Sequence, residues 1–246
     1  MDKKKVVFFG TKKIGLECLK ILYGNQSKLN YEIIGVLTNK KSDKIKDYSL
    51  KRHLNVLNSL SSYLILDEVD ILISIQYHKI LNMKHIKKAK EISINLHMAP
   101  LPEYRGCNQF SLAIIEEKAF FGTTIHKLEE GIDDGDILFE TRFKIPQDCW
   151  IEELYEITYN KSLELFKKSL PEIISLKFKP ISQIELTKER GSSIHFRKEI
   201  EKLKKIDLSL NKNEIEKYLR ATMMNGFDPP YAEINGKKIY FKKEVV

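Results

Sequence analysis

Short apolar runs recur through the first half of the chain, and longer segments with helical periodicity separate them. Four runs have the length and composition of buried strands, and they cover residues 6–9, 33–37, 71–75 and 92–96. Residues 14–22 gather apolar side chains on one helical face, directly after the first run. Parallel strands need such crossovers between them. The pattern therefore predicts an α/β fold, with a mostly parallel sheet covered by helices.

The second half of the chain changes its pattern near residue 180. Residues 123–128 and 137–145 alternate as strands do, and residues 151–176 return to a helical period. Beyond Pro180 we expect a polar, irregular stretch over 189–210 and a helix over 213–223. The chain then closes with a hairpin over 231–241, whose Asn235-Gly236 pair suits a type I′ turn.

These patterns predict a large domain over residues 1–180 and a small α+β tail over residues 181–246 that ends in the hairpin. The lysine-rich segment 39–52 is predicted to be a solvated loop.

The charge balance favours an anionic partner. The formal net charge is +8, which suits nucleic acid, a membrane surface or a phosphorylated small molecule. No tract approaches the ~20 apolar residues that cross a bilayer, and the first residues lead straight into a strand without a signal-peptide pattern. Cys18, Cys107 and Cys149 are far apart, which fits neither a disulfide framework nor a zinc site. We expect a cytoplasmic protein with reduced thiols.

Asn95 and His97 stand two residues apart at the end of a predicted strand, so their side chains leave the same face. Ligands bind at the carboxyl ends of strands in open parallel sheets. A histidine there can move protons, and an asparagine amide can donate to a developing oxyanion. The alternative is an asparagine that caps a turn and a histidine that is buried with a backbone partner.

The acidic segment 131–136 lies between two predicted strands. One of its carboxylates could orient a histidine, or the segment could be a soluble turn or a calcium loop. The spacing does not fit an EF-hand. Segment 10–15 carries glycines at both ends but lacks the order of a dinucleotide or P-loop motif.

The remaining reactive side chains suggest no further site. His126 is expected to be a satisfied core histidine inside a strand, and Cys107 a small packing residue. No cluster of histidines and cysteines has metal-ligand spacing, so no metal is predicted. The other histidines follow no pattern; they are His53, His78, His85 and His195.

In combination the motifs are more specific than any one of them. After an amino-terminal Phe8-Phe-Gly-Thr11, Asn95-x-His97 is followed by Leu101-Pro-x-Tyr-Arg-Gly106, by Thr124-Ile-His126 and by the Gly-Ile-Asp-Asp-Gly-Asp turn at 131–136. This order resembles the formyltetrahydrofolate-dependent formyltransferases over roughly residues 5–180. The resemblance implies a Rossmann-like formyltransferase domain and N10-formyltetrahydrofolate as cosubstrate. It also implies a catalytic triad in which Asn95 stabilises the oxyanion, His97 handles the proton and Asp133 orients the imidazole.

The same resemblance suggests where the two substrates bind. The donor's pterin is expected beside Ser74, Ile75, Gln76, Tyr77, Ile80, Leu128 and Gly131. The stretch 97–110 and the tail segment 225–231 are similar to sugar N-formyltransferases that act on thymidine-diphosphate (dTDP) amino sugars. Acceptor-binding residues are then expected at Arg105, Asn108, Gln109, Phe227 and Tyr231.

Two of these assignments keep an alternative. Phe227 and Tyr231 could stack on a pyrimidine or merely pack the hairpin. Arg105 could meet a phosphate or buttress the loop of the site.

The resemblance favours formylation of the 4-amino group of a dTDP-linked dideoxy sugar for a surface polysaccharide such as an O-antigen, by a homodimer. We expect no nucleic-acid or membrane partner. A methionyl-tRNA formyltransferase is the alternative within the family, although only about 65 residues follow position 180 here. A uridine nucleotide remains open, and so does a non-catalytic binding module on the same fold.

Overall fold

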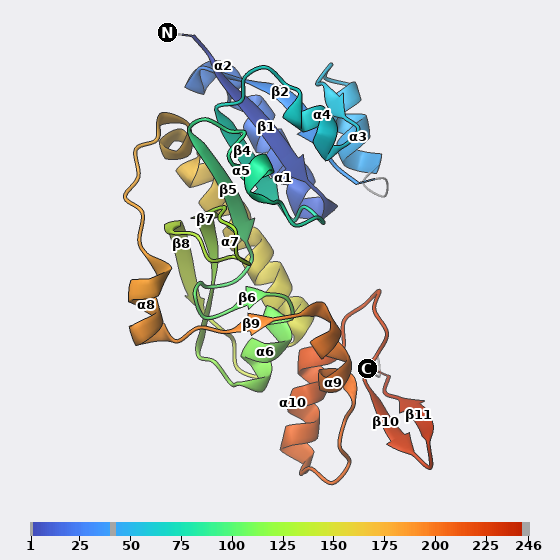
Figure 1. Cartoon of the computed structure of the whole chain (residues 1–246). Coiled ribbons are helices and arrows are strands. Elements are labelled where there is room, and N and C mark those ends of the chain that lie inside the picture. The colour runs from blue at the N-terminus through green and yellow to red at the C-terminus, as the bar shows by residue number, and fades with distance from the viewer. Residues whose placement is uncertain (1, 40–42, 243–246) are drawn as a thin grey trace.

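The computed structural model describes residues 2–39 and 43–242. Its central sheet contains β1 (Lys4–Gly10), β2 (Tyr31–Leu37), β3 (Val56–Leu57), β4 (Ile71–Ile75), β5 (Ile92–His97), β7 (Phe120–Lys127) and β8 (Ile137–Lys144). The strand order is β3-β2-β1-β4-β5-β7-β8 (Figure 1). The first five strands run parallel, and β7 and β8 are antiparallel to their neighbours. The mostly parallel α/β fold is therefore confirmed.

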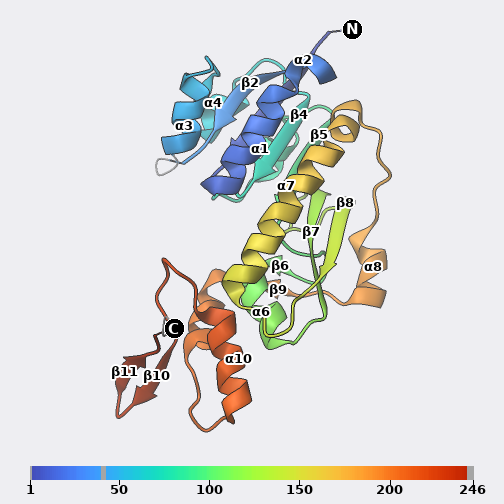
Figure 2. The same cartoon turned by 180° about the vertical axis from the view of Figure 1, so that it is seen from behind.

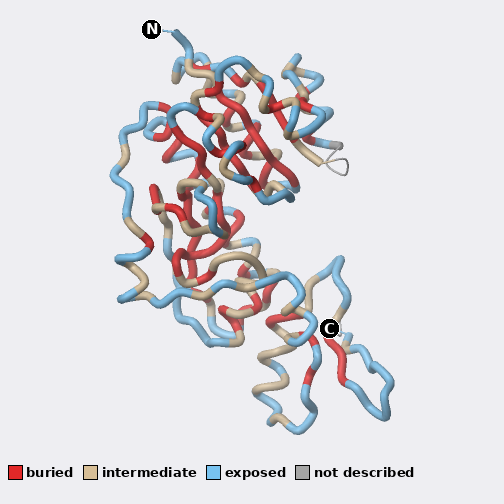
Figure 3. Tube along the Cα trace, viewed as in Figure 1, coloured by how far each residue is buried: buried red, intermediate tan, exposed pale blue. Residues whose placement is uncertain are grey.

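Helices cover both faces of the parallel half of the sheet. Two long helices, α1 (Lys12–Gly24) and α7 (Ile151–Ser175), pack on one face (Figure 2). The short α4 (Leu60–Leu64) and α5 (Met83–Ile86) pack on the other. Successive residues of β1 serve the two faces in turn: Val6 and Phe8 join one apolar cluster and Val7 and Phe9 the other. A strand buried on both sides has to be apolar throughout, and Figure 3 shows this core in red.

A third apolar cluster lies beyond the parallel strands. It joins α6 (Gln109–Ile115) and β7 to α10 (Lys212–Thr222), whose Ala221 is fully buried. The predicted hairpin is present as β10 (Tyr231–Ile234) and β11 (Lys237–Tyr240). Its turn residues Asn235 and Gly236 have φ of 48° and 73°, as a type I′ turn requires. Figure 1 shows the hairpin standing away from the sheet.

Two sequence predictions differ from the structure. Segment 39–52, predicted as a loop, contains α3 (Asp43–Leu50); its residues 40–42 lie outside the described part. The helix forms because Ile45 is 1% exposed in the core while lysines take the outer face. The stretch 189–210, predicted as irregular, holds short elements: β9 (Ile194–His195), the 3-10 helix η1 (Arg197–Glu199) and α9 (Ile200–Lys204). A further short helix, α2 (Gln26–Leu29), precedes β2.

The chain after residue 180 first returns along the sheet and only then forms the tail. Ile181 exchanges backbone hydrogen bonds of 2.8 and 2.9 Å with Ile137 at the start of β8. α8 (Gln183–Arg190) follows, and its Arg190 contacts Glu140 of β8 at 3.0 Å. β9 then pairs in parallel with β6 (Arg105–Gly106). The boundary at 180 stays a prediction, and residues 181–195 lie against the first domain.

Candidate functional site

The carboxylate of Asp133 gathers four groups from three parts of the fold. Its Oδ2 lies 3.5 Å from His97 Nδ1 and accepts the N–H of Gly106 at 3.0 Å. Its Oδ1 lies 3.4 Å from both Asn95 Nδ2 and His126 Nε2. The structure therefore brings together the three residues that the sequence singled out, and it adds His126.

The sheet explains why these side chains meet. Asn95 and His97 are two residues apart on β5, so both point to one face. β5 pairs antiparallel with β7, and the register sets Asn95 directly opposite His126. Opposed residues in an antiparallel pair hold their side chains close together, and Asn95 Nδ2 lies 3.2 Å from His126 Nε2. His126 is 1% exposed with a backbone partner, as expected of a core histidine, but it also belongs to the site.

His97 is 5% exposed, and its two ring nitrogens face different partners. Nε2 contacts the Tyr104 carbonyl at 2.7 Å. Because a carbonyl oxygen only accepts, Nε2 must carry the proton of this bond. Nδ1 then faces Asp133 Oδ2. The ring is held at both ends, and Nδ1 is the nitrogen left to take a proton.

Asp133 is ionised at neutral pH. Burial alone would raise the pKa of this carboxyl, but His97, the contact with His126 and the Gly106 N–H together hold the pKa well below its ordinary value. A fixed negative charge therefore lies beside His97.

This lowered pKa predicts how stability depends on pH. The folded-state pKa of Asp133 lies below the unfolded value of about 3.9. Its stabilising contribution is therefore present above about pH 4 and is lost as pH falls through the folded value. Urea unfolding of the wild type and of Asp133→Asn should show the widest difference in unfolding free energy near neutrality and a narrowing one below about pH 4. A constant difference would contradict the pairing.

The loop that carries Gly106 is held by residues 193–196, here called the strap. Arg105 N–H donates to Ser193 O at 3.0 Å, and Cys107 N–H donates to His195 O at 2.9 Å. Asn108 donates its side-chain amide to Phe196 O at 2.8 Å. The strap thus fixes the backbone that offers an N–H to Asp133.

His195 contacts Glu199 Oε2 at 2.8 Å and Ser193 Oγ at 2.9 Å. This arrangement is similar to a hydrolytic triad. However, the Ser193 hydroxyl donates its proton to the Glu103 carbonyl at 2.6 Å. The network therefore secures the strap.

Gly106 allows the strap to lie this close. Its φ is +84°, and a Cβ there would stand 2.3 Å from His195 O. Gly106→Ala should lower the free energy of unfolding by at least about 2 kcal/mol, since a left-handed φ and a backbone clash combine. The matched control is Gly226→Ala, where φ is +82° but no atom lies within 4 Å. If denaturant titrations show equal losses of unfolding free energy for the two variants, the strap moves away from the added Cβ at no measurable cost.

The sheet reverses its order between β1 and β4, and such switch points bind ligands in open α/β sheets. The loops that leave these two strands touch: Lys12 Nζ donates to Gln76 Oε1 at 3.0 Å, and the Thr11 hydroxyl donates to Gln76 O. Lys12, Gln76, Asn108 and Asp133 all have positive φ, between 48° and 62°. Non-glycine residues held in this region cluster at functional sites.

The residues predicted to meet the donor follow β4 or precede Asp133. Ser74 and Ile75 are buried in β4, and Gln76 and Tyr77 are half-buried beyond it. Ile80 is 82% exposed on the same loop. Leu128 is half-buried and Gly131 is exposed on the turn that carries Asp133. Their contact with a donor stays a prediction.

The residues predicted to meet the acceptor separate into three places. Arg105 and Asn108 lie in the loop under the strap, and Gln109 opens α6. Phe227 is 66% exposed, in the loop before β10. Tyr231 is 8% exposed, with its ring 5.9 Å from that of Tyr240 and 4.0 Å from Lys238 Nζ. For Tyr231 the geometry favours the packing alternative.

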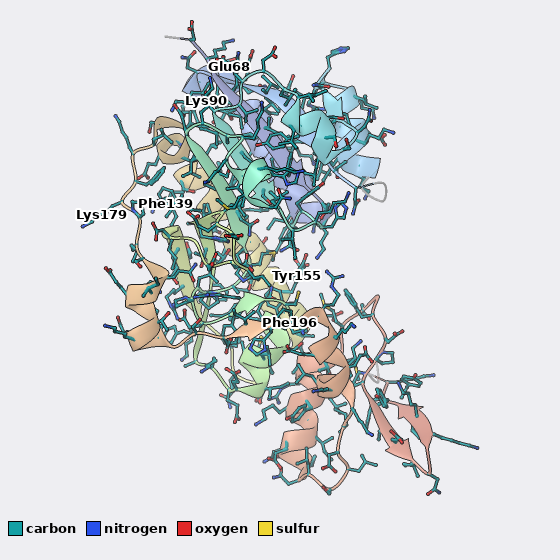
Figure 4. The ribbon with its side chains drawn as sticks, in the orientation of Figure 1. Glu68, Lys90, Phe139, Tyr155, Lys179 and Phe196 are labelled. Carbon is teal, nitrogen blue, oxygen red and sulfur yellow. The ribbon has the colours of Figure 1, made fainter. Side chains whose placement is uncertain are left out.

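One exposed aromatic residue was not singled out from the sequence. Phe196 is 58% exposed and ends the strap, at the junction between the first domain and the tail (Figure 4). The sequence offered one indication of Phe196, namely that it is an apolar residue within a polar stretch.

Residues 2–39 and 43–242 hold no group of three or more metal-ligating side chains. Over the same residues no helix has the length and hydropathy to cross a bilayer.

The sequence profile of the formyl transferase family matches residues 4–170. The bifunctional polymyxin resistance protein ArnA of Wigglesworthia glossinidia brevipalpis is 32% identical over 232 residues, which are 88% of this chain and 34% of that protein. The first curated relatives also include methionyl-tRNA formyltransferases, and the chain spans between 34% and 63% of the lengths of these relatives.

Two solved structures share the fold over nearly the whole chain. A 4-N formyltransferase from Francisella tularensis is 21% identical with a TM-score of 0.83, covering 99% of this chain and 98% of its own. An N-formyltransferase from Helicobacter canadensis, solved with folinic acid and dTDP-3-aminofucose, is 24% identical with a TM-score of 0.76, covering 97% and 86%.

Proposed function

Because this chain belongs to the formyl transferase family, we propose that it transfers a formyl group from N10-formyltetrahydrofolate to the 4-amino group of a dTDP-linked dideoxy sugar. The observation that carries the proposal is the ionised Asp133 gathered with His97 and Asn95. These groups lie where a sheet of this kind binds its ligands. The fold shared with sugar N-formyltransferases supports the acceptor class.

In this reaction the neutral amine of the acceptor would attack the formyl carbon and lose a proton. The bond between that carbon and N10 of the donor would then break, and the departing N10 would take up a proton as tetrahydrofolate leaves. His97 Nδ1 is the nitrogen available to take the proton of the amine, because Nε2 is engaged with the Tyr104 carbonyl. The resulting imidazolium lies 3.5 Å from Asp133, whose charge stabilises it. General-base assistance of this kind is worth about 10²–10⁴ in rate.

Asn95 supplies an N–H to the oxygen that becomes negative when the amine adds to the formyl group. Its present contacts, 3.2 Å to His126 and 3.4 Å to Asp133, are long for hydrogen bonds. Turning one N–H toward the oxyanion therefore costs little. Donors aimed at such an oxygen are worth about 10²–10³ in rate.

The donor's pterin would bind between the loop after β4 and the turn that carries Asp133. Ile80 and Tyr77 offer apolar surface there, and backbone groups of the two segments would supply the polar contacts. This mixture suits a flat heterocycle with hydrogen-bonding edges.

The acceptor's diphosphate would bind beside the strap. Arg105 Nε is buried without a hydrogen-bond acceptor among the described residues. Lys12 and Arg197 also repel each other: desolvation and then the charge of Arg197 lower the pKa of Lys12. A bound anion would reduce this repulsion. Asn108 and Gln109, which follow Arg105 closely in the chain, would contact the sugar. The exposed Phe227 would contact the base.

We further propose a cytoplasmic homodimer that needs no metal and binds neither nucleic acid nor membrane. Its product would enter a surface polysaccharide such as an O-antigen. Light scattering would report the oligomeric state.

The test is a formyl-transfer assay against a panel of amines. The panel holds dTDP 4-amino and 3-amino dideoxy sugars, a uridine-diphosphate 4-amino pentose and charged methionyl-tRNA. Turnover of the dTDP 4-amino sugar at a rate far above the others is the expected result. Turnover of a different nucleotide sugar would keep the reaction and correct the acceptor.

Formylation of methionyl-tRNA is the second candidate, because several relatives carry that name and the net charge is +8. Turnover of the tRNA alone would establish it. No turnover of any amine, together with tight binding of a nucleotide sugar, would indicate a binding module.

A further inference from the structure

We infer that Gln183 is a positioning residue for the formyl transfer: from α8 it holds the turn that presents Asp133 to His97 and Asn95. The inference rests on the proposed function, because it concerns the geometry of that reaction. Gln183 Nε2 donates to Asp133 O at 2.9 Å and to Gly135 O at 2.7 Å. The side chain is 1% exposed, so water cannot readily replace it in these bonds.

The turn needs outside support because its backbone is strained. Asp133 has a φ of +48°, which costs a non-glycine residue about 1–3 kcal/mol unless its surroundings enforce it. Gly135 lies so close to β7 that a Cβ there would stand 2.2 Å from Lys127 O. The two carbonyls that Gln183 binds flank this tight passage on both sides.

Small displacements of the turn would matter to the chemistry. Asp133 already lies 3.4–3.5 Å from Asn95, His97 and His126. A shift of about 1 Å would break these contacts, and misplacement of that size can cost about 10²-fold in rate.

A glutamine fits this role in charge and reach. Two carbonyl oxygens need two N–H donors, and a side-chain amide supplies both from one nitrogen. The Gln183 Oε1 is buried with no hydrogen-bond partner among the described residues, so the residue accepts an uncompensated polar atom in order to donate twice. A carboxylate there would repel both carbonyls.

The position of Gln183 is itself fixed. Ile181, two residues earlier, is hydrogen-bonded to Ile137 through both its N–H and its carbonyl. At the other end of α8, Arg190 contacts Glu140 at 3.0 Å. The helix is thus anchored to β8, and Gln183 transmits that anchorage to the turn.

The experiment compares Gln183→Leu and Gln183→Glu with the wild type in formyl-transfer kinetics and thermal unfolding. We expect kcat to fall by about 10- to 100-fold while KM for each substrate changes by less than about threefold. For Gln183→Glu, the ratio of variant to wild-type kcat should rise severalfold as pH falls from about 8 to about 6. The reason is that burial raises the pKa of an unpaired carboxyl, which then donates when protonated.

Thr187→Val is the matched control on the same helix. Among the described residues the Thr187 hydroxyl bonds only within α8, to Gln183 O at 2.9 Å, so this variant should lose some stability and keep kcat within about twofold. A merely structural role for Gln183 predicts parallel behaviour of all three variants, with kcat following stability and no recovery at low pH.

The outcomes separate this inference from the proposed function. An active wild type with folded Gln183 variants of normal kcat would overturn the positioning role and leave the reaction intact. If neither variant folds, Gln183 serves the fold and the positioning role is rejected. A wild type inactive on every amine of the panel would reject the proposed function instead.

Discussion

Replacing His97 by alanine lowers kcat for formyl transfer by at least a hundredfold and leaves the protein folded, if the site works as its geometry indicates. The loss follows from removing the nitrogen that takes the proton, a contribution of about 10²–10⁴. The fold should survive because, among the described residues, the polar contacts of the His97 side chain are those with the Tyr104 carbonyl and Asp133, and the backbone bonds of residue 97 remain in the variant. Steady-state kinetics with the preferred amine, beside circular dichroism, measure both quantities.

Two further variants separate proton transfer from support. His97→Gln keeps an N–H for the Tyr104 carbonyl but cannot take the proton, so it should be as slow as His97→Ala. Asp133→Asn should fall by a similar factor, because its side chain keeps the size and loses the charge. Near-normal rates for both His97→Ala and Asp133→Asn would reject the assignment of these residues.

Replacing Asn95 by alanine is expected to lower kcat by about 10²–10³, the range found for other oxyanion donors. Most of the loss should appear in kcat with little change in KM, because the N–H is needed only when the oxygen becomes negative. Asn95→Asp is the more severe test of this role, because a carboxylate of the same shape has no N–H to donate and its negative charge would face both the oxyanion and Asp133.

Asn55→Ala is the matched control for Asn95. Asn55 also donates its amide, to Ile34 O at 3.2 Å, but it lies exposed beside β2. Its variant should behave as wild type. A kcat for Asn95→Ala within fivefold of this control would show that another donor serves the oxyanion.

Strands β1, β2, β4 and β5 were predictable because each contains a largely apolar run that is buried on two faces, and β1 shows why in its alternating clusters. α3 was missed because the segment 39–52 is rich in lysine, while Ile45 and Ser49 of the helix are buried. β9 was missed because two residues form a strand only when a partner 89 positions earlier, such as Arg105 for Ile194, accepts them. Local pattern cannot report such a partner.

The candidate site likewise contains residues that local sequence patterns predict and residues that depend on distant partners. Asn95 and His97 share a face by spacing alone, but Asp133 was placed beside them only by the resemblance of its turn to a family motif. Gln183 was not found, and His126 was expected only as a motif residue in the core, although each touches the site. Their contacts depend on the register between β5 and β7 and on the path of α8, and neither is written in a short segment of sequence.

The return of residues 181–196 along the sheet also determines where this chain can be truncated or joined to a relative in a chimera. The family profile ends at residue 170, before the segment that braces the Asp133 turn and the Gly106 loop. A fragment trimmed near that limit would retain Asn95, His97 and Asp133 and lose the residues that hold the Asp133 turn and the Gly106 loop in place. Chimeras that exchange tails between relatives should therefore be joined after residue 199, so that α8 and the strap travel with the domain they support.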